Sequence, residues 1–171
     1  MKQEIDVFDY AGTICHALKK GVLLTTKVGD KVNTMTIGWG KIGVEWNKPV
    51  FIAYVRESRF TRNMLDENGE FTVNIPYGVC DSKILGYCGS KSGRDTDKIQ
   101  DLSLTLEPPV AIQVPGIRDL PLTLECKVIY QQLQDLEQIP EEIRQKFYPG
   151  QTPDLHIAYY GEIVGAYIIK E

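Results

Sequence analysis

Four residues able to bind an anion stand close together after an apolar run of this sequence. They are Arg56, Ser58, Arg59 and Thr61, at a point where a helix is expected to begin. Guanidinium groups, hydroxyls, free backbone amides and the positive end of a helix dipole together form a cradle for a phosphate. Ser58 and Thr61 are equally residue types that cap a helix. The pattern therefore predicts a phosphate site or a capped helix start, and the two arginines favour the phosphate.

A second group of polar residues lies upstream, on a predicted strand. Asn33, Thr34 and Thr36 offer amide and hydroxyl groups, while Met35 and Trp39, four positions apart, are expected on one face of that strand. Met35 and Trp39 alone would be ordinary core residues. Buried polar side chains need partners, however, and these suit the edge of a heterocycle. Taken with the phosphate site, they predict an aromatic ligand that carries a phosphate.

Three further features are weaker candidates. The polar segment Ser90–Lys98 is expected to be either a solvated loop or a lid over the ligand. Its acids lack the further oxygen ligands of a calcium loop, so no metal is predicted. Of the two histidines, His156, at the start of the last long strand, is the candidate for lining the site. Cys88 lies near the polar segment, where the expected role is that of an inert packed thiol.

The run Gly38–Gly43 matches G-x-G-x-x-G literally, the fingerprint of a dinucleotide-binding unit. In that unit the third glycine lies in a helix that crosses back over a sheet, which needs roughly ten or more residues before the next strand. Here Pro49 opens the next apolar run only six residues after Gly43. The dinucleotide interpretation is therefore rejected. A Walker A loop at Gly89–Ser92 fails as well, because the glycine before its lysine is missing.

The whole chain limits the classes of protein that fit. Its 171 residues predict one domain spanning positions 1–171, and the 43% of apolar residues suffice for a core. The net charge is −4, without a basic tail, so nucleic acid is not expected as a partner. No apolar run approaches the ~20 residues of a membrane span, so no membrane association and a cytoplasmic location are expected. The four cysteines form no C-x-x-C pair and are expected to be reduced thiols.

Strand signals dominate the secondary structure. Seven strands are expected as β-prone or apolar runs bounded by turn residues: Val22–Val28, Val32–Trp39, Pro49–Val55, Glu70–Ile75, Val110–Val114, Leu120–Tyr130 and Ile157–Ile169. Four short helices are expected at Tyr10–Lys20, Thr61–Asn68, Val79–Cys88 and Pro140–Phe147. Gly29-Asp30 should form a hairpin turn, and Gly161 and Gly165 should bend or bulge the last strand. Many close-spaced strands with a few helices predict a mainly β protein, a β-barrel with peripheral helices.

At these residues the chain resembles the flavin reductase-like family, the FMN-binding split barrels. The matching pieces occur in the family's order over most of residues 20–168: Asn33–Thr36 with Trp39, Lys48-Pro49, Arg56–Thr61, Glu70–Pro76, Ser92–Lys98 and Gly161–Val164. The first ~20 residues and an insertion at 131–156 match less well.

The resemblance implies a split barrel of Greek-key type that forms a homodimer and holds FMN, or as an alternative FAD, non-covalently near the subunit interface. Asn33, Thr34, Met35 and Thr36 would contact the isoalloxazine and ribityl region. Arg56, Ser58, Arg59 and Thr61 would hold the phosphate, and the Ser90–Lys98 loop would close the site. The full set of cofactor-binding residues so implied is Asn33, Thr34, Met35, Thr36, Trp39, Arg56, Ser58, Arg59, Thr61, Asn74, Ser90, Ser92 and Lys98.

Three functions then compete. The first is an NAD(P)H-dependent flavin reductase, in which hydride chemistry belongs to the flavin N5 and no catalytic side chain is required. The second is a flavoredoxin-like electron carrier that exchanges electrons with a redox protein partner and does not turn over nicotinamide. The third is a barrel without cofactor, whose arginines are merely solvated.

Overall fold

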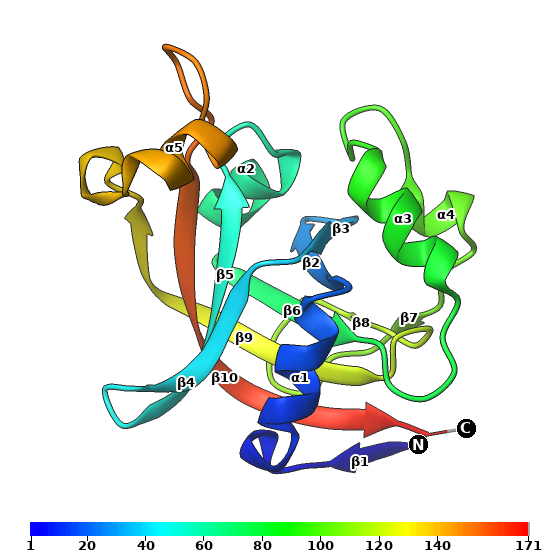
Figure 1. Cartoon of the computed structure of the whole chain (residues 1–171). Coiled ribbons are helices and arrows are strands. Elements are labelled where there is room, and N and C mark those ends of the chain that lie inside the picture. Colours follow the sequence, from blue (N-terminus) through cyan, green and yellow to red (C-terminus); the bar gives the residue numbers. More distant parts are fainter. Residues whose placement is uncertain (171) are drawn as a thin grey trace.

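The computed structural model describes residues 1–170 and consists mainly of β-structure (Figure 1). The strands are β1 (Lys2–Glu4), β2 (Val22–Val28), β3 (Lys31–Ile37), β4 (Gly40–Glu45), β5 (Lys48–Arg56), β6 (Glu70–Ile75), β7 (Leu106–Glu107), β8 (Gly116–Ile117), β9 (Leu122–Leu133) and β10 (His156–Ile169). The helices are α1 (Ala11–Leu18), α2 (Phe60–Glu67), α3 (Ser82–Ser90), α4 (Lys98–Asp101) and α5 (Glu141–Phe147), with 3-10 turns at Val7–Tyr10 and Leu136–Gln138.

One antiparallel sheet forms the body of the protein. Its strand order is β3-β2-β6-β9-β10-β5-β4, and β1 pairs with the far end of β10. The two edge strands, β3 and β4, are consecutive in the chain, so the curled sheet closes on itself only through the short connection Gly38-Trp39. The predicted mainly β, barrel-like fold with peripheral helices is confirmed, and the split of the barrel lies between the edge strands β3 and β4 (Figure 1).

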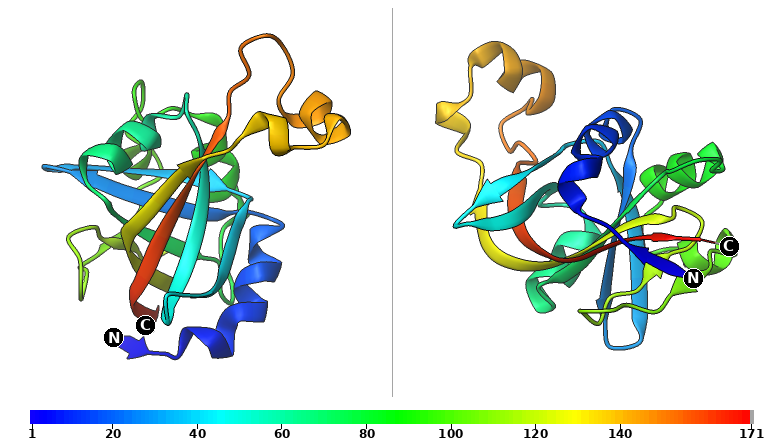
Figure 2. Two further views of the ribbon diagram at one scale, coloured as in Figure 1. Left: turned by 90° about the vertical axis from the view of Figure 1, so that its left-hand side faces the viewer. Right: turned by 90° about the horizontal axis from the view of Figure 1, so that it is seen from below.

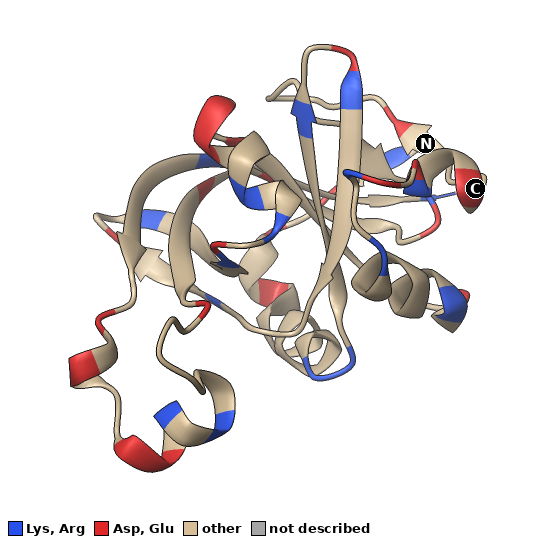
Figure 3. Ribbon diagram, turned by 90° about the horizontal axis from the view of Figure 1, so that it is seen from above, with Lys and Arg blue, Asp and Glu red and all other residues tan. Residues whose placement is uncertain are grey.

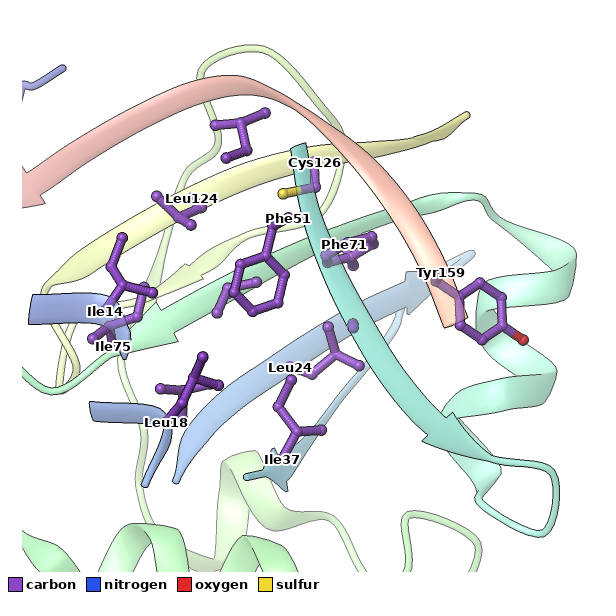
Figure 4. Close-up of a cluster of buried hydrophobic side chains, with 14 of the residues drawn as sticks. Ile14, Leu18, Leu24, Ile37, Phe51, Phe71, Ile75, Leu124, Cys126 and Tyr159 are labelled. Atoms are coloured by element: carbon purple, nitrogen blue, oxygen red, sulfur yellow. The ribbon is translucent and has the colours of Figure 1, made fainter. Parts of the chain in front are cut away.

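Large apolar side chains from six strands (β2, β3, β5, β6, β9 and β10) and from α1 fill the interior (Figure 4). Phe51, Phe71, Leu124 and Tyr159 are completely inaccessible to solvent. The last strand bends around this core as predicted, with register shifts at Tyr160/Gly161 and Ile163/Gly165. Gly161 is required there because a Cβ at this position would come within 2.5 Å of the Phe71 ring.

The glycine-rich run of the fingerprint is a strand edge and not a phosphate loop. Gly40–Glu45 is β4, which pairs with β5 through a tight turn at Trp46-Asn47, where φ is +52° and +56°. These left-handed angles are those of a two-residue hairpin turn. The structure therefore confirms the rejection of the dinucleotide interpretation, and it adds a strand that the predicted element list lacked.

One predicted strand is wrong. Residues 110–114 form a bend and not a strand, because the buried carboxylate of Glu125 accepts hydrogen bonds from Val110 N (2.8 Å) and Ala111 N (2.6 Å). Those amides are thereby withdrawn from any sheet ladder. The small strands β7 and β8 lie on either side of this bend and pair with each other.

The expected insertion at 131–156 projects from the barrel (Figures 1 and 2). Its helix α5 carries Glu141 and Glu142 in the first turn and Arg144 and Lys146 in the last, which matches the helix dipole (Figure 3). All four cysteines are free thiols. Within residues 1–170, no helix has the length and apolar character to cross a membrane.

Candidate functional site

A cavity of about 250 Å³ opens at the start of α2, facing the loop between α3 and α4. Five basic side chains line it against a single acid, Asp154; the basic residues are Arg56, Arg59, Lys91, Arg94 and Lys98. Hydroxyl groups of Ser58, Thr61 and Ser92 lie among them. In a chain with a net charge of −4, this is a local concentration of positive charge. The cavity is therefore chemically suited to an anion.

A second cavity, of about 170 Å³, adjoins the first and has an aromatic wall. Trp39, Tyr54 and His156 line it together with the backbone at the end of β3. The two cavities share Met35, Arg56 and Arg59, so they form one continuous surface. Taken together they reach the size of small-molecule sites, about 300–1,000 Å³.

The two hydroxyl residues at the start of α2 do not cap it. Arg59 occupies the N-cap position, and no side chain caps the helix there. The Ser58 hydroxyl donates to Asp154 Oδ2 at 2.6 Å, and the Thr61 hydroxyl accepts from Asn33 Nδ2 at 3.0 Å. The capping alternative is therefore wrong, because both hydroxyls bond to side chains outside α2.

The two arginines have different surroundings. Arg56 donates to the carbonyl oxygens of Phe147 (3.2 Å) and Asp154 (2.7 Å), and so it fastens the insertion to the end of β5. Arg59 is exposed, and among residues 1–170 its side chain makes no hydrogen bond within the protein. Its guanidinium group is thus available to a ligand in either cavity.

The Ser90–Lys98 segment contributes only part of its predicted residues. Ser92 and Lys98 line the cationic cavity, whereas Ser90 bonds to the Tyr87 carbonyl of its own helix and lies outside both cavities. Lys98 is buried and donates to Thr34 O (2.8 Å) and Cys88 O (3.1 Å). Burial lowers the pKa of this lysine and raises the pKa of the Cys88 thiol to about 11. Lys98 therefore ties α3 to β3, and Cys88 remains an uncharged packed thiol at neutral pH.

Arg94 and Lys91 are site residues that the sequence reasoning missed. Arg94 donates to the Ser58 carbonyl at 3.1 Å and lies 5.5 Å from the Phe60 ring centre, which joins the loop to the start of α2. Both are basic residues of the polar Ser90–Lys98 loop, but the sequence does not show which basic residues of this loop reach the cavity. The tertiary contacts do. Gly93 between them packs so closely that a Cβ would come within 2.1 Å of Asn33 Oδ1.

The four predicted residues of strand β3, Asn33–Thr36, do not all line the two cavities. Met35 lines both cavities and Thr36 lines the aromatic one. Thr34 bonds through its hydroxyl to Thr25 Oγ1 at 3.0 Å, away from both cavities. Asn33 bonds to Thr61 and lines a neighbouring hollow of about 440 Å³. Of these four predicted residues, only Met35 and Thr36 therefore line the two cavities.

The structure places Asn74 apart from this surface. Its side chain is fully buried, accepts from the Thr25 hydroxyl at 2.8 Å and donates to the Thr123 hydroxyl at 3.3 Å. These contacts join β2, β6 and β9 inside the sheet, and Asn74 lines neither cavity. Its observed contacts are therefore structural.

His156 belongs to an aromatic cluster that joins the barrel to the insertion. Its ring centre lies 4.7 Å from that of Trp39, and its Nδ1 is 2.8 Å from the Tyr148 hydroxyl. Phe147 packs edge-on against Trp39 at 5.1 Å. Burial, helped by the nearby positive charge of Arg56, lowers the pKa of His156 to about 4. The imidazole is therefore uncharged at neutral pH.

The low pKa of His156 predicts a loss of stability in acid. Histidine in an unfolded chain has a pKa of about 6.5. In the folded protein the pKa of His156 is about 4, so the unfolded chain binds the extra proton first as pH falls. We expect wild type to lose on the order of 1–2 kcal/mol of unfolding free energy relative to His156→Gln between roughly pH 7 and pH 5. Urea unfolding of both proteins at each pH measures this difference. Parallel pH profiles for the two proteins would rule the prediction out.

Comparison with known proteins identifies the family. The model of the flavin reductase like domain matches residues 16–171, so the chain belongs to that family. Among curated relatives, it is 31% identical over 100 residues to an uncharacterized protein of Archaeoglobus fulgidus, covering 58% of this chain and 55% of the relative. It is 29% identical over 111 residues to the uncharacterized protein YddH of Escherichia coli, covering 63% and 58%. The matches thus span less than two thirds of those relatives.

Solved structures agree with this fold. The flavoredoxin of Methanosarcina acetivorans is 28% identical with a TM-score of 0.66, over 88% of this chain and 68% of that one. The flavoredoxin of Desulfovibrio vulgaris is 23% identical with a TM-score of 0.67, over 88% and 69%. An FMN-binding domain of a flavin reductase-like enzyme from Shewanella baltica is 19% identical with a TM-score of 0.64, over 98% and 77%. The predicted split-barrel family is therefore confirmed.

Proposed function

We propose that this chain is an FMN-binding oxidoreductase that holds FMN non-covalently across the two cavities. The observation that carries the proposal is the junction of a cationic cavity with an aromatic one through Met35, Arg56 and Arg59. A phosphate needs charge and hydrogen-bond donors, and a flavin ring needs an apolar wall with polar partners at its edge. The family and the FMN-binding domain from Shewanella baltica support the same cofactor.

Different residues of the two cavities would bind the phosphate and the ring system of FMN. Arg59, Arg94 and the Ser58 and Ser92 groups would hold the phosphate, while Met35, Thr36 and Trp39 would lie against the ring system. FMN, when bound, supplies the hydride and electron chemistry. The side chains of the site then bind and orient it, and the uncharged His156 keeps the Trp39 indole in place. No side chain here is assigned as a catalytic acid or base.

The reaction we propose is flavin reduction at the expense of NADH or NADPH, the nicotinamide being the co-substrate. An anaerobic spectrum tests it directly. Purified protein loaded with FMN should lose its visible absorbance when about millimolar NADH or NADPH is added, at a rate well above that of free FMN. If neither nucleotide bleaches the bound flavin, the reductase proposal fails while FMN binding still stands.

Binding itself can be followed by tryptophan fluorescence, because the chain has two tryptophans and Trp39 lines the aromatic cavity. Trp46 lies in the β4–β5 turn. In a Trp46→Phe variant, FMN should quench the remaining emission; in Trp39→Phe, the quenching should be much weaker. If FMN leaves the emission of Trp46→Phe unchanged, the proposed position of the ring is rejected. If the purified protein is colourless and does not bind added FMN, the proposed function is rejected.

A second candidate function is favoured by the similarity to two flavoredoxins. We propose as this alternative an FMN electron carrier that exchanges electrons with a redox protein partner and does not turn over nicotinamide. The bleaching experiment separates the two functions, since dithionite would reduce the bound flavin of an electron carrier while NADH and NADPH would not.

We also propose a homodimer as the working form. The outer side of the sheet carries aromatic residues, of which Trp46 is 57% exposed and Tyr130 is 42% exposed, with ring centres 6.1 Å apart. Tyr160 extends this group, 4.9 Å from Tyr130. Large exposed aromatic groups are characteristic of interfaces. Light scattering after size-exclusion chromatography should give twice the mass of 19.3 kDa, and a monomer would contradict this part of the proposal.

A further inference from the structure

The carboxylate of Asp154 accepts hydrogen bonds from two donors of Ser58, just before the start of α2. Its Oδ1 accepts from the backbone N–H of Ser58 at 3.0 Å, and its Oδ2 accepts from the Ser58 hydroxyl at 2.6 Å. A backbone amide and a hydroxyl from one residue thus grip both oxygens of one acid. This two-point contact is the form in which a protein binds an anionic oxygen pair.

The same donors belong to the cationic cavity. Asp154 is the single acid among the residues that line it, opposite five basic side chains. A phosphate placed in this cavity needs N–H and O–H donors of the kind that Ser58 supplies, and these cannot serve both anions at full strength. If the phosphate lies beside the carboxylate instead, the two negative charges repel each other.

We infer that Asp154 competes with a bound phosphate group for the Ser58 donors, and so sets the preference of the site between phosphorylated and unphosphorylated ligands. The competitor belongs to the segment 131–156 that projects from the barrel. This inference rests on the proposed function for its physiological ligand, FMN, but the competition is a property of any phosphate anion in the cavity.

Release of the Ser58 donors needs only a rotation of the Asp154 side chain. The Asp154 carbonyl is held by Arg56 Nη1 at 2.7 Å, and the Leu155 carbonyl accepts from Glu57 N at 2.9 Å. These two backbone contacts keep the segment in place while the carboxylate turns away. The side chain is only half-buried, so water can solvate it after release.

Asp154→Asn tests the inference because it removes the charge and keeps the size of the side chain. We expect the variant to bind FMN roughly five- to tenfold more tightly than wild type, because a neutral amide is a weaker acceptor and does not repel a phosphate. Riboflavin, which has the same ring system and no phosphate, should bind both proteins within about twofold. Inorganic phosphate, followed by calorimetry, should likewise bind the variant more tightly.

Asp135→Asn is the matched control. Asp135 lies in the same insertion and accepts a backbone hydrogen bond, from Glu137 N at 3.0 Å, but lines neither cavity. It should leave the affinities for FMN and for phosphate unchanged. Thermal melting verifies that each variant is folded, and Asp154→Ala replaces the asparagine variant if that one is not.

The outcomes separate the inference from the proposed function. Unchanged or weaker FMN binding by Asp154→Asn, in a protein whose wild type binds FMN, overturns the inference alone. A parallel gain for riboflavin also overturns it, because the effect would then not concern the phosphate. If neither protein binds FMN, the proposed function fails, and the phosphate titration decides the inference by itself: equal or undetectable phosphate binding in both proteins rejects it.

Discussion

Arg59→Ala is expected to weaken FMN binding by about 1–3 kcal/mol, a rise in Kd of roughly five- to 150-fold. Arg59 lines both cavities and is exposed, and its side chain makes no hydrogen bond to the rest of residues 1–170. Removal of the Arg59 side chain should therefore change the stability of the fold little, whereas the ligand loses a charged partner. The loss should be larger for FMN than for riboflavin if the guanidinium group holds the phosphate.

Fluorescence titration of Arg59→Ala with both ligands measures this difference. Arg62→Ala is the matched control, because Arg62 lies one turn further along α2, pairs with Asp66 Oδ2 at 3.0 Å and lines neither cavity. The control should retain wild-type affinity for FMN. An Arg59→Ala protein with unchanged affinity, or with equal losses for FMN and riboflavin, would remove Arg59 from the phosphate site.

The cationic cavity was largely predictable because much of it is local in sequence. Ser58, Arg59 and Thr61 are brought together by one strand end and one helix start, and a spacing of a few residues determines their proximity. The sheet architecture was predictable for a similar reason, since alternating and apolar runs bounded by turn residues specify strands without knowledge of their partners.

The parts that escaped prediction depend on contacts between distant segments. Asp154 reaches Ser58 across 96 positions, and Arg94 reaches Ser58 across 36. The second reason why predicted and observed site residues differ is the surroundings of strand β3. All four residues of Asn33–Thr36 were predicted to contact the ligand, but only Met35 and Thr36 line the two cavities. Neighbours outside the strand, here α2 and α3, decide which faces are open.

Glu125 explains the wrong strand at 110–114 and leads to the prediction with the largest effect on stability. Its side chain is fully buried on β9, and its two oxygens accept from Val110 N and Ala111 N. The sequence pattern of a strand gives no indication that a glutamate within it accepts hydrogen bonds from a distant backbone segment. We expect Glu125→Ala to lower the free energy of unfolding by about 2–4 kcal/mol, because it leaves a cavity and two amides without their acceptor.

Urea unfolding measures this loss, with Glu162→Ala as the control. Glu162 pairs with Lys48 at 2.7 Å on the adjacent strand β10, in a partly exposed position, and such pairs contribute at most about 1 kcal/mol. A loss below about 1 kcal/mol for Glu125→Ala, equal to that of the control, would show that water replaces the carboxylate as acceptor. Because Glu125 lines neither cavity, the folded fraction of Glu125→Ala should still bind FMN with wild-type affinity. A variant that loses stability and keeps its affinity for FMN would show that the bend at 110–114 supports the barrel and not the site. A loss of both would contradict this, because the contacts of Glu125 do not connect it to either cavity.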